Sequence, residues 1–220
     1  MFALLVPSLI ILHLTNSSAN NLITNPVSSL KQIPQEPTPA PFYELTIPYL
    51  RQRDYKSTLS KLNQISRNQN YTSYLTSYHS DGLKINGLLT IPNGPAPQSP
   101  EGEVGWPAIV FVHGYIPPHQ YKTTEKYVAY VDYLAKNGYV VFKIDLRGHG
   151  QSEGNPGGAY YSSDYIIDTL NARAALQSSD FVNPNKIGLW GHSMAGNVVF
   201  RSFVAAQKIP AVVIWVYLSP

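Results

Sequence analysis

The chain has 220 residues, no cysteine, and a net charge of +3 that arises from 16 basic and 13 acidic side chains. A hydrophobic fraction of 44% is enough for one sizeable core, so the composition favours a single α/β domain with a tail. Because no run of Lys or Arg occurs, the sequence argues against a nucleic-acid partner, and the lack of Cys excludes disulfides and thiolate chemistry.

The N-terminal segment Phe2 to Leu14 is an apolar run shorter than the roughly 20 residues of a membrane-spanning helix. Ser17 and Ala19 place small side chains where a signal peptidase would cut after Ala19. We therefore expect residues 1–19 to be a signal peptide or anchor, and the protein to be secreted, periplasmic or tethered to a membrane. No Lys or Arg precedes the apolar run, so an uncleaved anchor and a misassigned start codon stay open as alternatives.

The next two segments carry no clear fold signal. Residues 20–41 are rich in Asn, Ser, Thr and Pro, cannot bury enough apolar surface to fold, and are expected to be a disordered linker. Residues 42–70 mix apolar and basic positions without a clean period, and are predicted to be an N-terminal extension with a short helix. Residues 71–220 are expected to form the α/β domain.

The α/β domain begins with a hairpin pattern around Asp81 and Gly82, whose second arm alternates apolar and polar residues and so predicts one buried face. Its alternating apolar positions are Leu83, Ile85, Leu89 and Ile91. Four short apolar runs follow, each typical of a strand in the middle of a parallel sheet, covered on both faces. They span residues 108–112, 139–144, 186–190 and 211–218.

Helical patterns separate these runs. They cover residues 123–137 and 163–178, and a third helix is predicted to begin at Ser193. Strands and helices that alternate after an antiparallel hairpin predict an open, mostly parallel sheet with helices on both faces. Such sheets bind ligands beyond the carboxyl ends of their strands.

Ser193 lies in the string GHSMAG, directly after the strand predicted at residues 186–190. A serine at such a strand-to-helix turn is typical of a G-x-S-x-G nucleophile, whose hydroxyl stands clear of the backbone. Gly191 supplies one small neighbour, whereas the other is Ala195 in place of Gly, so the strict pattern is missed by one methyl group. Ser193 is therefore the candidate nucleophile, and the alternative is an ordinary N-cap serine.

Three strings in this order, HGYIPP, DLRGHGQSEG and GHSMAG, resemble those of the α/β-hydrolase superfamily. They are most similar to its exported, propeller-less branch related to prolyl oligopeptidase and dienelactone hydrolase, over about residues 71–218. The resemblance implies an α/β-hydrolase fold and a serine hydrolase that cleaves carboxylic esters or small peptide-like amides through an acyl-enzyme at Ser193. It further implies an oxyanion hole made by the backbone N–H groups of Tyr115 and Met194.

The other residues that could be taken for catalytic ones are interpreted as structural. His113 is expected to brace the loop after its strand, and Asp145 and Arg147 to hold their own loop, because the family's triad acid follows the nucleophile in chain order. The glycines of DLRGHGQSEG do not have the spacing of a dinucleotide loop, and paired histidines at metal-ligand spacing are absent. No cofactor and no metal are therefore expected, and the Gly- and Tyr-rich segment 150–163 is placed beside the pocket.

The triad cannot be completed after Ser193, because the 27 residues that follow it contain neither an acid nor a histidine. The six histidines all precede Ser193, and none is a convincing base. The last apolar run would also form an uncovered sheet edge. We therefore expect residues 71–220 to be a partial α/β-hydrolase domain that lacks the triad Asp and His with its last strands and helices, and to be almost inert alone. The alternative is an inactive hydrolase-like binding module or a truncated gene product.

Overall fold

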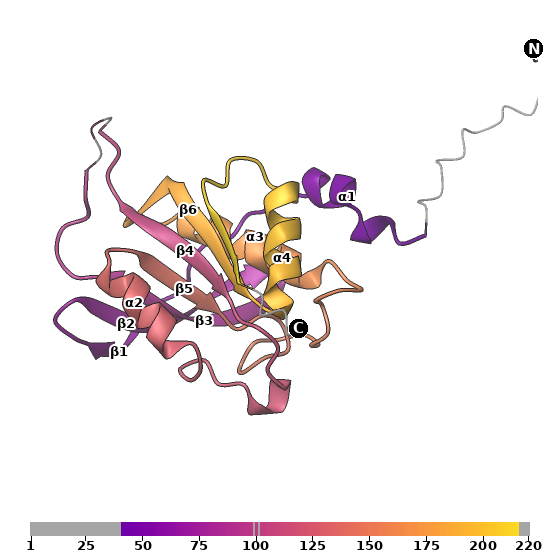
Figure 1. The fold of residues 1–220 in the computed structure, drawn as a ribbon, viewed down its shortest axis with the longest axis horizontal. Helices are drawn as coiled ribbons and strands as arrows, with labels where there is room; N and C mark the ends of the chain where they lie inside the picture. Colours follow the sequence, from indigo (N-terminus) through magenta and orange to yellow (C-terminus); the bar gives the residue numbers. More distant parts are fainter. Residues whose placement is uncertain (1–40, 99, 101, 216–220) are drawn as a thin grey trace, which may run out of the picture. The chain divides into compact units, whose positions relative to one another are not determined.

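The computed structural model describes residues 41–98, 100 and 102–215 (Figure 1). The predicted signal peptide or anchor at residues 1–19 lies outside the described residues, as does all but the last residue of the predicted linker at 20–41. The end of the last predicted strand, residues 216–218, lies outside them as well. Across the described ranges, no helix has both the length and the apolar character needed to cross a membrane.

The described chain forms one mixed sheet with helices packed on it (Figure 1). The strands are β1 Asn63–Arg67, β2 Tyr71–Ser80, β3 Leu83–Pro92, β4 Trp106–Val112, β5 Val140–Ile144, β6 Val182–His192 and β7 Val212–Trp215. The helices are α1 Ile47–Gln52, α2 Val128–Lys136, α3 Asp164–Gln177 and α4 Met194–Ala205, with short 3-10 turns at Tyr43–Leu45 and Pro118–Gln120. The strand order is β1-β2-β3-β5-β4-β6-β7, in which β5, β4, β6 and β7 are parallel and the β1–β2–β3–β5 ladders are antiparallel.

Both faces of the central strands are covered, as their continuous apolar runs predict. On one face Val110 of β4 and Phe142 of β5 belong to the main core, which includes residues of α3 and α4 such as Ile166 and Val198. On the other face Phe111 belongs to a second cluster with residues of β3, β5, β6 and α2. Alternate side chains of a strand point to opposite faces, so a strand between two helical layers needs apolar residues throughout.

The hairpin forms where it was predicted, but the prediction of a single buried face is wrong. Asp81 and Gly82 both have positive φ, at 52° and 78°, as a tight turn between right-handed twisted strands requires. From Gly87 onward β3 is buried on both faces, since Leu88 and Leu89 are each buried against different clusters. The reason is that β3 lies inside the sheet, between β2 and β5, with α2 packed on it.

Two further differences concern a strand that was not predicted and a helix that begins later than predicted. Residues 42–70 contain α1 but also β1, which pairs with β2 and so joins the sheet. Every residue of β1 is exposed, so no hydrophobic period marks it. The helix predicted from residue 123 begins only at Val128, because Lys126 and Tyr127 adopt left-handed φ values of 57° and 56°.

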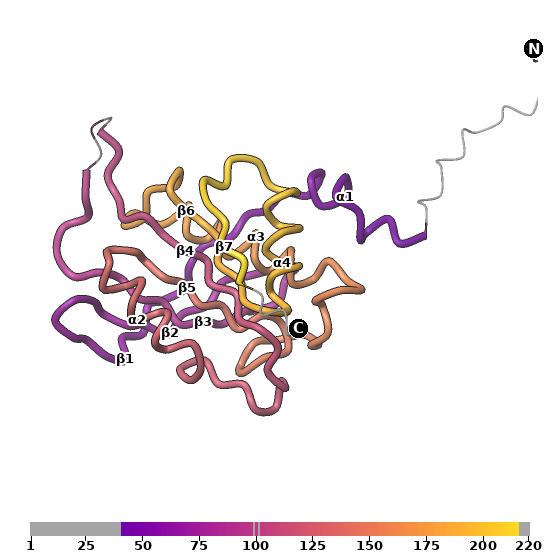
Figure 2. Tube along the Cα trace, viewed as in Figure 1, coloured from indigo at the N-terminus to yellow at the C-terminus, as the bar shows by residue number. Residues whose placement is uncertain are grey.

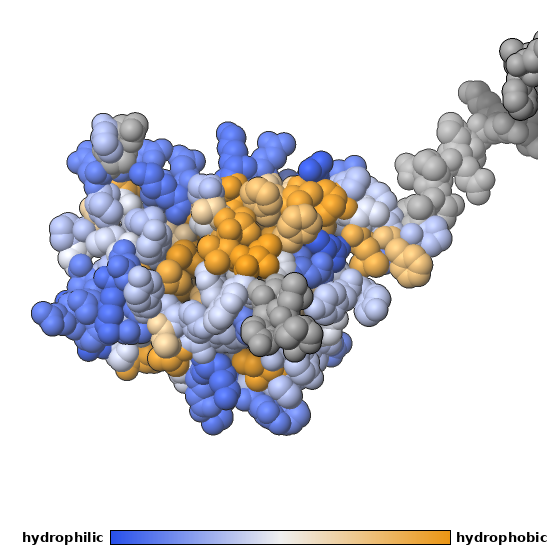
Figure 3. Space-filling view, in the orientation of Figure 1, coloured by the Kyte–Doolittle hydropathy of each residue, from blue (hydrophilic) through white to orange (hydrophobic). Residues whose placement is uncertain are grey.

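The last apolar run was predicted to suit the middle of a sheet and yet to form an uncovered edge in this chain, and its described part does lie at a sheet edge. There, β7 pairs with β6 on one side and with no strand on the other, and it packs beside α4 (Figure 2). The side chains of Val213, Ile214 and Trp215 are between 41% and 50% exposed. Together with Phe200 and Phe203 of α4, which are also exposed, they form an apolar surface along this edge (Figure 3).

Candidate active site

Ser193 occupies a strained turn between β6 and α4. Its φ of 54° and ψ of −117° lie outside the regions that residues with a Cβ normally adopt. A Cβ at Gly191 would approach the Ala195 carbonyl oxygen and the Val199 side chain to 2.7 Å, so only glycine permits this close packing of β6 against α4. The strand-to-helix context predicted for Ser193 is thereby confirmed.

The Ser193 hydroxyl does not serve as a helix cap. Ser193 stands at the N-cap position of α4, yet its side chain accepts no capping hydrogen bond. Its backbone N–H donates to the Trp215 carbonyl at 2.9 Å, and its carbonyl accepts from the Gly196 N–H at 2.8 Å. The backbone is therefore fixed on both sides, while the exposed hydroxyl is available to a ligand.

A cavity of about 360 Å³ opens beside Ser193. Tyr115 and Met194 also line it, so the structure brings together all three residues predicted for the site. The rest of the wall comes from the loop after β4, the loop after β5 and the segment that leads into α3: Pro118, His149, Pro156, Gly157, Ala159, Tyr160, Tyr161 and Tyr165. This segment overlaps residues 150–163, which the sequence placed beside the pocket.

The backbone N–H groups of Tyr115 and Met194 donate to no acceptor among the residues that the structure describes. Met194 is the first residue of α4, where helix geometry leaves the N–H groups without a partner and the helix dipole favours negative charge. The Ser193 N–H, in contrast, is already bonded to Trp215. These two amides therefore stay the predicted donors of the oxyanion hole.

His113 bridges two loops at the carboxyl ends of neighbouring strands. Its Nδ1 lies 2.7 Å from the Gly114 carbonyl oxygen, and its Nε2 lies 3.1 Å from the Asp145 carbonyl oxygen. The ring is fully buried, and burial lowers the pKa of the imidazole to about 4, although the two carbonyls act in the opposite direction. A neutral imidazole has one N–H and donates to only one of these carbonyls, but a buried ring packed between the ends of β4 and β5 agrees with the expected bracing role.

Replacing His113 with asparagine is expected to flatten the pH dependence of stability. The folded-state pKa lies below the unfolded value, so the unfolded chain takes up a proton first and stability falls as the pH drops from about 6.5 toward 4. The loss attributable to His113 is about 2 kcal/mol between pH 7 and 5. Urea unfolding of the wild type and H113N at both pH values measures it. A slope in H113N equal to that of the wild type would contradict the assignment.

Asp145 holds the segment that follows the loop after β4. Its buried carboxylate accepts hydrogen bonds from the Tyr121 hydroxyl at 2.8 Å and the Thr123 hydroxyl at 2.6 Å. Burial raises the pKa of Asp145, and these two hydrogen bonds oppose the rise. On the same strand, the buried Lys143 ammonium donates to the Tyr121 hydroxyl and to the Glu125 carbonyl, both at 3.3 Å, and burial lowers its pKa to about 8. The sequence does contain a signal for this contact, since Lys143 interrupts the apolar run YVVFKI. The sequence analysis did not predict a role for Lys143.

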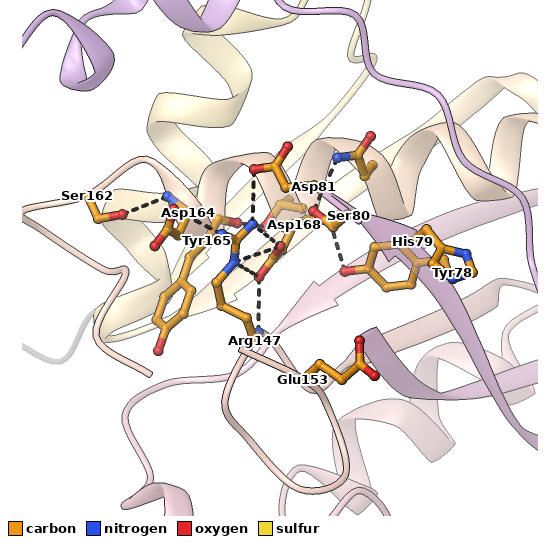
Figure 4. Close-up of polar contacts among 12 residues, drawn as sticks. Tyr78, His79, Ser80, Asp81, Arg147, Glu153, Ser162, Asp164, Tyr165 and Asp168 are labelled. Atoms are coloured by element: carbon orange, nitrogen blue, oxygen red, sulfur yellow. Dashed lines mark hydrogen bonds and ion pairs between the residues drawn. The ribbon is translucent and has the colours of Figure 1, made fainter. Parts of the chain in front are cut away.

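Arg147 is the centre of a buried ion cluster (Figure 4). Its guanidinium donates to Asp168 through Nε and Nη2, with Nη2 2.7 Å from Oδ1, and its backbone N–H donates to the same carboxylate at 3.0 Å. Nη1 lies 3.0 Å from Asp164, and Nη2 lies 3.4 Å from Asp81 in the β2–β3 turn. Burial raises the pKa of Asp168, and the Arg147 guanidinium opposes this. The structural interpretation of Arg147 is confirmed, and its main partner Asp168 was not identified from the sequence.

Side chains of α4 anchor the cavity wall to the helix that begins at the serine. The Asn197 amide donates to the Ala159 carbonyl at 2.7 Å, and the Arg201 guanidinium donates to the Ser162 carbonyl at 3.1 Å. Ser193 and this part of the cavity wall are therefore both held by α4.

The histidines nearest to Ser193 are held by other groups. His192 Nδ1 lies 2.8 Å from the Tyr127 hydroxyl, and His149 Nδ1 lies 3.2 Å from the Arg147 carbonyl oxygen. Burial lowers the pKa of His149, which favours its neutral form. Within the described ranges, no histidine is hydrogen-bonded to Ser193, and no group of His, Asp and Glu side chains could hold a metal ion.

Two curated proteins are similar to about half of the chain. The thiohydrolase aneE of Aspergillus aculeatus is 32% identical over 117 residues, which are 53% of this chain and 32% of that protein. The quorum-quenching protein AidA of Acinetobacter baumannii is 29% identical over 114 residues, which are 52% of this chain and 36% of that protein. The matched part of the chain thus spans about a third of the length of these relatives.

The fold is shared with solved hydrolase structures. An acetyl xylan esterase from Paenibacillus sp. R4 superposes with a TM-score of 0.58 at 19% identity, over 76% of this chain and 55% of that one, and this likeness concerns the fold alone. The sequence model of the family described as "Serine aminopeptidase, S33" matches residues 107–220, which include the cavity residues and β4 to β7. The predicted α/β-hydrolase fold is thus confirmed, and the chain belongs to the serine aminopeptidase S33 family of hydrolases.

Proposed function

We propose that this chain carries the nucleophile of a serine hydrolase that cleaves carboxylic esters through an acyl-enzyme at Ser193. The observation that carries the proposal is the exposed hydroxyl on a strained strand-to-helix turn, beside a cavity that two backbone amides also border. Membership of a hydrolase family supports hydrolysis as the reaction. The sequence resemblance to the propeller-less branch stays a finer prediction within that family.

In the first step, Ser193 Oγ attacks the ester carbonyl carbon, and its proton passes to a general base. The amides of Tyr115 and Met194 would stabilise the negative charge on the carbonyl oxygen. Collapse of the tetrahedral intermediate breaks the bond to the leaving alcohol, which takes the proton, and water then hydrolyses the acyl-enzyme. We propose that the base is a histidine, oriented by an acidic residue, and that both lie outside the described residues.

A neutral ester fits the cavity better than a charged substrate. The side chains along the described wall are four tyrosines, two prolines, Ala159, Met194 and a histidine whose lowered pKa favours the uncharged form, beside the Ser193 hydroxyl. Aromatic faces and apolar groups bind uncharged acyl or alcohol groups by burial of apolar surface. The name of one similar protein, a thiohydrolase, supports an ester-like bond as the target. A small peptide-like amide is the second candidate, because the family model is that of an aminopeptidase.

From residues 1–19 alone, we also propose an extracytoplasmic location, with a membrane tether as the alternative.

A fluorophosphonate probe tests the nucleophile directly. Ser193 Oγ is expected to form a bond to phosphorus as fluoride leaves, so peptide mass spectrometry of the natural gene product should find the adduct on Ser193. Ser202 lies on the same helix with its hydroxyl bonded to the Val198 carbonyl, so S202A should label like the wild type, and S193A should not label.

A folded natural protein without label on Ser193 would overturn the proposal. If such a protein also bound an ester without turnover beyond that of S193A, the inactive binding module would be the correct alternative.

A further inference from the structure

One phenol oxygen joins the two loops that carry the predicted oxyanion donors. The Gly114 N–H donates to the Tyr127 hydroxyl at 2.9 Å, and the same hydroxyl lies 2.8 Å from His192 Nδ1. The Gly114 N–H can only donate, so Tyr127 accepts from it, and the phenol proton can then be donated to His192 in the tautomer whose Nδ1 carries no proton. Gly114 directly precedes Tyr115, and His192 precedes Ser193 and Met194, so the link lies immediately behind the site.

The space around this link is tight. A Cβ at Gly114 would lie 2.7 Å from the Tyr127 hydroxyl and 3.0 Å from both Nδ1 and the carbonyl oxygen of His192. The three groups are therefore packed at contact distance, and the loop after β4 cannot approach or leave the turn after β6 without breaking a hydrogen bond.

The surrounding structure fixes the position of Tyr127 itself. Tyr127 and Lys126 both have left-handed φ, a conformation that costs free energy in residues with a Cβ and persists only where other contacts enforce it. The preceding Glu125 carbonyl accepts from the buried Lys143, and the Tyr127 ring packs edge-on against Phe111 at 5.4 Å. Burial also raises the pKa of Tyr127, so its hydroxyl keeps the proton that it donates.

We propose that Tyr127 is a positioning residue that sets the separation of the Tyr115 and Met194 amides by tying Gly114 to His192. This inference rests on the proposed function of Ser193. Oxyanion donors act at about 2.7 to 3.1 Å from the developing charge, and one such donor typically carries a factor of about 10² to 10³ in kcat. A displaced donor loses part of that factor while the substrate still binds, because the charge exists only in the transition state.

The test is Y127F in the natural gene product, which keeps the ring and removes both hydrogen bonds. We expect kcat for a p-nitrophenyl ester to fall about 10- to 100-fold with KM within about twofold. A trifluoromethyl ketone, whose adduct with Ser193 carries an oxyanion, should bind more weakly by a similar factor. Tyr130 in α2, the helix that begins directly after Tyr127, supplies the control, since its hydroxyl bonds to no described residue and Y130F should leave kcat and inhibition unchanged.

A second pair of variants tests the other end of the link without changing Tyr127. In H192N the amide oxygen can take the place of Nδ1 as acceptor, so kcat should stay near the wild-type value, whereas H192L should lose activity as Y127F does. The inference would be overturned if Y127F had the same kcat as the wild type, or if a rise in KM accounted for the whole loss of kcat/KM. Either result would count against it even if Ser193 is labelled. Absence of label on Ser193 in the wild type would instead overturn the proposed function, so the two failures are distinguishable.

Discussion

Replacing Ser193 with alanine is expected to lower kcat for ester hydrolysis by a factor on the order of 10⁶ in the natural gene product. The reason is that S193A removes only Oγ, the atom that forms the acyl bond in the proposed mechanism. The remaining cavity and backbone amides give about 10³ to 10⁴ over the uncatalysed reaction. Initial rates with a p-nitrophenyl ester, corrected for spontaneous hydrolysis, measure the effect.

The fold should be preserved in S193A, because alanine retains the Cβ and the hydroxyl makes no capping hydrogen bond that the variant would lose. The melting temperature therefore serves as the control for structure. A variant that keeps activity within tenfold of the wild type, or a wild type no faster than S193A, would show that Ser193 is not the nucleophile.

Replacing Arg147 with methionine is expected to lower the free energy of unfolding by about 3 to 5 kcal/mol. Methionine fills similar space but leaves Asp168, whose side chain is 0% exposed, without its counter-charge and without three of its hydrogen bonds. Asp164 would also lose its cation, whereas Asp81 would keep the guanidinium of Arg53. Urea unfolding followed by circular dichroism gives the difference in free energy.

The matched control is an ion pair on the surface. Lys56 and Asp54 lie 3.0 Å apart with side chains 82% and 83% exposed, and K56M should change the free energy of unfolding by less than about 1 kcal/mol. In a double-mutant cycle, R147M/D168N should be more stable than R147M, because the buried charge has been removed. A loss of under about 1 kcal/mol in R147M would contradict the role assigned to this cluster.

The predictable parts of the fold are those in which burial of a segment determines which residue types it contains. The runs at residues 108–112 and 139–144 are apolar, apart from Lys143, because helices cover both faces of β4 and β5, and the structure places strands there. The turn at Ser193 was predictable for a similar reason, since a small residue at position 191 is a local requirement of the close approach between β6 and α4.

The parts that were missed depend on partners far along the chain or on backbone angles that the residue type does not indicate. β1 is exposed on both faces and exists because β2 offers it hydrogen bonds. The late start of α2 follows from left-handed φ at a lysine and a tyrosine, residues that rarely adopt it. The link between Tyr127 and His192 joins positions that are 65 residues apart, so no local pattern could show it.

The contacts of Arg147 and Tyr127 also have a consequence for the order of folding events. Arg147 meets Asp81 across 66 residues, and Tyr127 meets His192 across 65, so each contact forms only after a long loop has closed at a cost in chain entropy. Parallel pairing of β4 with β6 is non-local in the same sense, and such pairings form slowly. A partly folded or nascent chain would therefore lack the arrangement of loops that lines the cavity beside Ser193.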